Sequence, residues 1–127
     1  MLSQPRGCVR CGFGFMFEIL EDYYAGPRTA LVVCDAERRI LAASGTASAV
    51  TGYQERDLLG HEVISRLGLA GWVGEDPAAK SLEWGVRVLG VRCTFRPNGL
   101  EADRPATADF FPAYDDDGGL LVAITPS

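Results

Sequence analysis

The clearest pattern in the sequence is a pair of short apolar runs that flank a polar turn. Ala30–Cys34 is a continuous apolar run, which is typical of a buried central strand. Residues 35–39 are mostly polar, and Ile40–Ala43 is apolar again. The two runs are therefore predicted to form a β-hairpin.

Three more strands are predicted in the last third of the chain. Val91, Cys93 and Phe95 alternate with polar residues, as in a half-buried strand. Residues 105–114 are strand-like, and the apolar run 120–124 predicts the last strand. The Asp- and Gly-rich segment between these two runs predicts a hairpin turn over 115–119.

Helices are predicted before the first hairpin and between the two groups of strands. Apolar residues at helical spacing indicate a helix over 13–24, which the Ala-Gly-Pro sequence after it ends. Between the strands, helices are expected over 44–50, 55–59, 62–67 and 76–89. The predicted fold class is α+β: a five-stranded antiparallel sheet with helices crossing one face, plus an N-terminal helix.

Length and charge limit what the chain can be. Its 127 residues suffice for one core, preceded by a cysteine knuckle and packing helix over 1–26, so that the main domain is 27–127. The net charge of −5, with bases scattered among acids, argues against nucleic acid as a partner. No run approaches the length of about 18 apolar residues that a membrane span needs. The first residues do not resemble a secretory signal, so a cytoplasmic location and no membrane partner are expected.

The order of elements and two stretches of sequence resemble the PAS family. The first stretch, residues 30–60, contains ALVVCD, a turn, ILAAS and TASAVTGYQERDLLG in that order. Its TGY is followed after four residues by LLG, and the family shows a similar pairing. FFPAYDDDGGLLVAITP resembles the last PAS hairpin, in which a D-x-D-G turn joins two core strands. The resemblance covers about residues 27–126, with Ser44 standing where many PAS domains carry Asn. It implies a PAS-like fold and a sensory or interaction role.

PAS domains often hold a cofactor between sheet and helices, and the residues argue against the two common ones. Flavin-binding photoactive relatives carry a cysteine in an NCRFLQ-like helix, whereas Cys34 and Cys93 fall on predicted strands and are expected to be buried and structural. A haem needs an axial ligand, and His61, the one histidine, follows Gly60 in a predicted loop. No flavin and no haem are therefore expected, and the cofactor-binding residues are left unassigned.

Two other groups of residues are candidates for a ligand or metal site. Four aromatic residues are expected in the core, with the lining of an apolar ligand pocket as the alternative: Trp84, Phe95, Phe110 and Phe111. The three aspartates at 115–117 lack the spacing of a calcium loop and are interpreted as a solvated turn. No set of nucleophile, base and orienting group is recognisable, so no catalytic residue is predicted and the chain is not expected to be an enzyme.

The sharpest motif is CVRCG, in which Cys8 and Cys11 have knuckle spacing and Gly12 follows. It matches half of a zinc ribbon or rubredoxin-like site, whereas a structural zinc takes four ligands. Three interpretations are open: two chains share one zinc through Cys8 and Cys11 of each, the pair is a redox switch, or the thiols are unliganded. An iron–sulfur cluster is a fourth.

These observations predict a regulatory PAS-type sensory or interaction module that acts through protein–protein contacts. A homodimer joined by residues 8–24, with zinc shared between its knuckles, is expected, because one core covers only part of the apolar helix over 13–24. Its output would pass to a protein partner that the sequence does not identify. The alternative is a thiol- or metal-based redox sensor that uses Cys8 and Cys11.

Overall fold

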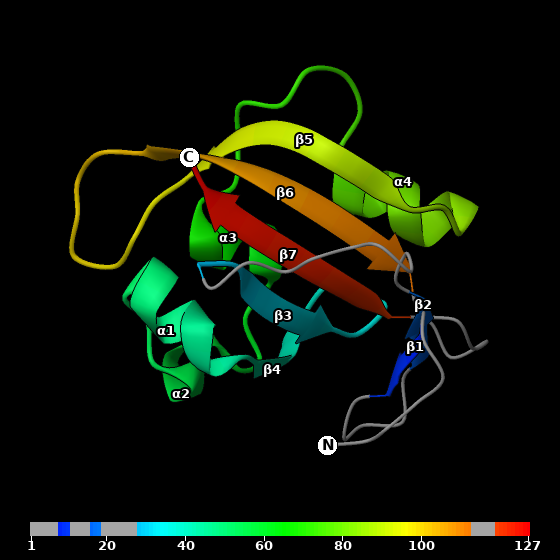
Figure 1. Ribbon diagram of the computed structural model, residues 1–127, viewed down its shortest axis with the longest axis horizontal. Coiled ribbons are helices and arrows are strands. Elements are labelled where there is room, and N and C mark those ends of the chain that lie inside the picture. The colour runs from blue at the N-terminus through cyan, green and yellow to red at the C-terminus, as the bar shows by residue number, and fades with distance from the viewer. Residues whose placement is uncertain (1–7, 11–15, 19–27, 113–118) are drawn as a thin grey trace.

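A five-stranded antiparallel sheet forms the body of the protein (Figure 1). The computed structural model describes residues 8–10, 16–18, 28–112 and 119–127. The strands of this sheet are β3 (Ala30–Cys34), β4 (Ile40–Ala43), β5 (Val88–Phe95), β6 (Arg104–Pro112) and β7 (Leu120–Pro126). Their order across the sheet is β4-β3-β7-β6-β5, so the last strand of the chain lies at the centre. The predicted α+β class is confirmed.

Four short helices connect β4 to β5 and pack against one face of the sheet, the inner face (Figure 1). They are α1 (Gly45–Thr51), α2 (Glu55–Leu58), α3 (Val63–Leu67) and α4 (Pro77–Trp84). Among the residues described, no helix is long and apolar enough to cross a membrane.

The core lies between these helices and the inner face of the sheet. Successive side chains of a strand point to opposite faces, so every second residue is directed inward. Val32 on β3 pairs with Val122 on β7, which pairs with Phe110 on β6, and this row is buried. Leu58 of α2 and Leu67 of α3 are buried in the same cluster.

The opposite, outer face of the sheet carries a second apolar row. Val33, Leu121 and Phe111 are neighbours across β3, β7 and β6. Leu121 is 4% exposed and Phe111 0% exposed, although the helices lie on the inner face. Farther along this face the hydroxyls of Thr29 and Thr125 hydrogen-bond to each other at 2.9 Å. The outer face is therefore apolar at one end and polar at the other.

The last helix is shorter than its sequence pattern predicts. Asp76 and Pro77 begin α4, but the helix ends at Trp84, and β5 already begins at Val88. The predicted helix over 85–89 is therefore wrong. Gly85 adopts a φ of 65° as the C-cap, a left-handed conformation that glycine accepts without strain and that stops the helix.

One arginine ties the N-termini of two helices to the turn between β3 and β4. Glu62 accepts a hydrogen bond from the Ser65 amide at 2.9 Å and caps α3, while Asp76 accepts from the Ala78 amide at 2.9 Å and caps α4. Arg38 forms ion pairs with both carboxylates, each with an N···O distance of 3.1 Å. Each cap thus orients a helix and also holds it to the sheet.

The N-terminal part contains a small antiparallel pair of strands, β1 (Cys8–Arg10) and β2 (Met16–Glu18). The predicted helix over 13–24 is therefore wrong at Met16–Glu18, and its remaining residues lie outside those described. Gly14 lies within the predicted helix and lowers helix stability by about 1 kcal/mol relative to alanine. The apolar residues have helical spacing in the sequence, whereas Val9 pairs with Phe17 in an antiparallel pair of strands.

The cap of α4 generates a stability prediction. We expect Asp76→Ala to lower the free energy of unfolding by about 1–2 kcal/mol, because it removes the cap and the ion pair to Arg38. Asp76→Asn keeps a capping oxygen and should lose less. Glu75→Ala, at the exposed neighbouring position, should change stability by less than about 0.5 kcal/mol. Urea denaturation measures all three, and equal effects of Asp76→Ala and Glu75→Ala would contradict the assignment.

Candidate functional site

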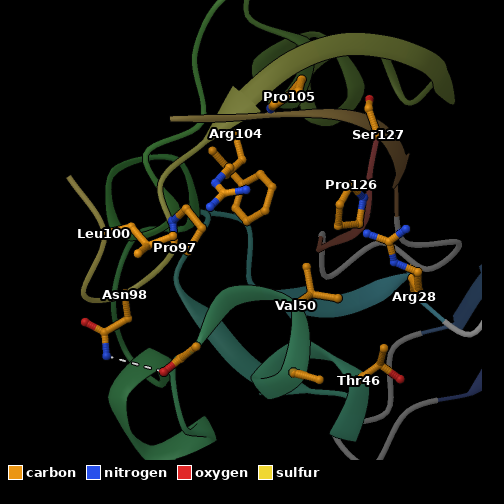
Figure 2. A pocket seen from close by; sticks show the side chains of 13 residues that line it. Arg28, Thr46, Val50, Pro97, Asn98, Leu100, Arg104, Pro105, Pro126 and Ser127 are labelled. Atoms are coloured by element: carbon orange, nitrogen blue, oxygen red, sulfur yellow. Dashed lines mark hydrogen bonds between the residues drawn. The ribbon is translucent and has the colours of Figure 1, made fainter. Parts of the chain in front are cut away.

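An open pocket of about 590 Å³ lies at one end of the sheet (Figure 2). Its walls come from segments far apart in the chain: α1, the loop 96–103 between β5 and β6, the start of β6 and the end of β7. Arg28, just before β3, completes the rim. We call this the α1 pocket.

The walls of the α1 pocket combine apolar and polar surface, with the apolar part the larger. Phe95, which is 2% exposed, borders it from the core, and Val50 of α1 also lines it. Leu100 and three prolines at 97, 105 and 126 add further apolar surface. A volume of this size lies in the range of pockets that hold small organic molecules.

Two exposed arginines stand at the mouth of the pocket. Figure 2 shows Arg104 above Val50 and Arg28 on the far side, beside Pro126. None of the described residues that line the pocket is acidic. Arg38, Arg39 and Arg96 each have a carboxylate oxygen within 3.2 Å, whereas no described carboxylate pairs with Arg28 or Arg104.

Asn98 fastens the loop wall of the pocket to α1. Its backbone amide donates to the Thr51 carbonyl at 2.8 Å, and its side-chain amide donates to the Gly52 carbonyl at 3.3 Å. Gly52 has a φ of 77°, and a Cβ there would lie 3.3 Å from the Asn98 carbonyl oxygen. The close approach of loop and helix therefore depends on glycine at this position.

Of the four aromatic residues expected in the core or in an apolar pocket, three are buried and one is not. Phe95 and Phe110 belong to the core beneath the helices, and Phe111 lies on the outer face of the sheet. The expectation that Trp84 is in the core or in a pocket is wrong, because its side chain is 69% exposed. It lies at the end of α4, whose buried side is formed by Ala78 and Ser81.

His61 lies on the surface and takes no part in the α1 pocket. Its ring nitrogens lie 2.9 and 2.8 Å from the Arg66 guanidinium, which also stacks over the Tyr53 ring at 5.5 Å. This cluster contains no carboxylate hydrogen-bonded to the imidazole. It therefore lacks the orienting acid that a histidine base usually has.

The cysteines of the sheet are structural, as predicted. Cys34 and Cys93 are both buried and free. Burial raises the pKa of the Cys34 thiol well above its ordinary value, and the neighbouring Asp35 and Glu62 carboxylates raise it further. Burial also raises the pKa of Cys93. Both are therefore protonated at neutral pH and make poor nucleophiles.

The predicted metal ligands are only partly within the described residues. Cys8 lies in β1, and Cys11 lies outside the described part of the chain, as do the three aspartates at 115–117. Within the described part, no three residues of His, Cys, Asp or Glu come together as a metal site.

Solved structures with the same arrangement identify the fold. The PAS domain of nitrogen regulation protein NR(II) from Vibrio parahaemolyticus aligns with a TM-score of 0.65 at 17% identity, over 81% of this chain and 93% of that one. A fungal LOV domain photoreceptor aligns with a TM-score of 0.60 at 16% identity, over 85% of this chain and 79% of that one. The PAS domain of an HTR-like protein from Haloarcula marismortui gives 0.56 at 12% identity, over 82% and 85%. The chain has the PAS fold.

The resemblance in the motifs of residues 30–60 and 110–126 thus pointed to the correct fold. No protein-family model matches the chain, and no curated protein matches it. At these identities, the structural likeness establishes the PAS fold and not the function that the fold serves here.

The residues that build the α1 pocket in this PAS fold were missed from the sequence. None of them belongs to a motif: Arg28 precedes β3, Asn98 lies in the loop 96–103, and Arg104 begins β6. The one available signal was the Pro- and Gly-containing loop 97–104, because long connections often carry binding residues. Nothing in the sequence brought that loop next to α1.

The burial of the sheet cysteines predicts slow labelling. In a background with Cys8→Ser and Cys11→Ser, Cys34 and Cys93 should react with a thiol reagent at least about a hundred times more slowly than a free peptide thiol, because both are buried with raised pKa values. The unfolded chain in urea is the matched control and should label both at the free rate. Fast labelling of the folded protein would show that β3 or β5 directs its cysteine to solvent and not into the core.

Proposed function

We propose that this protein is a regulatory PAS module that acts through protein–protein contacts and catalyses no reaction. The observation that supports this most directly is the apolar outer face of the sheet. The helices pack on the inner face, and Leu31 and Val33 remain half-buried beside the buried Leu121. Leu31 and Val33 are the part of this face that is still partly exposed, and a partly exposed apolar pair on one strand favours contact with another protein.

The polar groups of the described residues support the absence of catalysis. The Glu62 and Asp76 carboxylates cap helices and pair with Arg38. The thiols of Cys34 and Cys93 are buried and protonated, and His61 contacts an arginine. Each group has a partner that accounts for it structurally, so a nucleophile–base pair is not needed to explain any of them.

The expected partner is a second copy of the chain. Leu31 and Val33 lie on the same strand, two residues apart, and so on the same face. A two-fold partner brings this face onto its own copy, because a symmetric interface uses the same patch twice. The pair β1–β2 lies beside the end of β6 (Figure 1), so residues 8–24, the segment predicted to join the dimer, begin next to the sheet.

The CVRCG motif adds a second element to the proposal. Cys8 and the two residues after it form β1, which pairs antiparallel with β2 (Met16–Glu18). Two thiolates from each of two chains supply the four sulfur ligands of a structural zinc. The alternative function, a redox sensor that uses Cys8 and Cys11, depends on the same two thiols without metal.

The dimer prediction is tested by mass in solution. The protein should have twice the 13.7 kDa of one chain by light scattering. Val33→Lys places a charge on the half-buried outer face and should give a monomer at micromolar concentration. Thr107→Lys, at the polar end of the same face, is the matched control and should remain a dimer. Circular dichroism checks folding, and Leu31→Lys replaces Val33→Lys if the latter unfolds. A wild-type monomer would refute the dimer.

The zinc prediction is tested by metal analysis of the purified protein. One zinc for every two chains is expected, and Cys8→Ser or Cys11→Ser should each abolish it. Cys93→Ala leaves both knuckle thiols in place and should keep the metal. A metal-free protein whose mass or thermal stability changes on mild oxidation, and recovers on reduction, would instead favour the redox sensor.

A further inference from the structure

We propose that the α1 pocket binds a small organic carboxylate with an apolar body. The inference goes beyond the proposed function and holds whether or not the chain dimerises. It is carried by the combination of apolar side chains in the pocket wall with two arginines at the mouth that no described carboxylate neutralises.

The interior determines what most of the ligand must be. Val50 of α1 and Leu100 of the loop line the pocket, and the buried Phe95 borders it from the core. Apolar surface of this kind gains free energy by excluding water, so it favours an aliphatic or aromatic body over a fully polar molecule.

The arginines determine the head group. The protein has 17 acidic and 12 basic side chains, so carboxylates are abundant, and yet none of the described pocket residues is acidic. Arg96, in the loop 96–103, is neutralised by a carboxylate of the chain, since its guanidinium pairs with Asp103 at 2.9 Å. Arg28 and Arg104 have no such partner among the described residues, so an anion from outside the chain can pair with either of them.

A carboxylate suits this site better than a free phosphate. An arginine guanidinium matches a carboxylate with two parallel hydrogen bonds, and a single negative charge leaves the rest of the ligand free to enter the apolar interior. A free phosphate would contact the rim alone and leave the interior unused. The polar groups of Thr46 and Asn98 at the rim can serve the outer end of the ligand.

A ligand in the pocket would contact both α1 and the loop 96–103, which Asn98 connects by hydrogen bonds. Both belong to the folded state alone. Since a ligand that binds only the folded state stabilises it, occupancy should raise the melting temperature.

The experiment compares two probes that differ in charge but have nearly the same shape. 4-Phenylbutyrate and its neutral amide, 4-phenylbutanamide, are titrated into the full chain and followed by ¹H–¹⁵N NMR. We expect the carboxylate to shift the resonances of residues 46–52 and 95–105, to bind at least tenfold more tightly than the amide, and to weaken as salt increases. Inorganic phosphate should not displace it at equal concentration.

Variants locate the site. Arg28→Gln together with Arg104→Gln should weaken 4-phenylbutyrate at least tenfold and leave the amide unchanged. Arg92→Gln, an exposed arginine of β5 outside the pocket, is the matched control and should have no effect. Ala49→Phe fills the pocket from an exposed helix position and should weaken both probes.

The proposal is overturned if the carboxylate and amide bind equally, if the shifts lie outside the pocket residues, or if the double arginine variant binds as the wild type does. Displacement by phosphate would overturn it too, because the head group alone would then account for binding. None of these results bears on the dimer, which is judged by mass alone.

Discussion

The hydrogen bonding of β7 along both of its edges is the interaction on which the rest of the structure depends. β7 pairs with β3 on one side and β6 on the other, so it joins the first hairpin of the domain to the last pair of strands. Residues 120–124 are all buried, and burying a large aliphatic side chain contributes about 1.5–3 kcal/mol. Because consecutive residues point to opposite faces, this central strand requires apolar cover on both of them.

The register of β7 also positions the α1 pocket. Ala106 of β6 pairs with Pro126, and the Ser127 amide donates to the Pro105 carbonyl at 3.0 Å, which brings the end of β7 beside the start of β6. A slip of one residue would move every side chain of β7 to the other face and would also displace this corner of the pocket. The pocket is thus fixed by the same ladder that fixes the core.

The sheet has three regions with different surroundings. The inner face is filled by the core, the outer face has an apolar row at one end, and the polar end of the sheet lies toward the α1 pocket. β7 runs through both ends, from Thr125 to Leu121, and β3 lies beside it from just after Thr29 to Val33. A ligand at one end and a protein at the other would therefore contact opposite ends of the same two strands.

The sequence by itself determined the sheet strands, the short helices and the burial of Cys34 and Cys93, because these depend on local periodicity, on glycine ends and on strand phase. It failed over Met16–Glu18 and over 85–89, where apolar residues suited helical spacing but nearby glycines favoured a turn. The tertiary structure alone decided that Trp84 is exposed and that Arg28, Asn98 and Arg104 meet. These depend on which distant segments become neighbours when β7 inserts between β3 and β6, and no pattern within a short window records that.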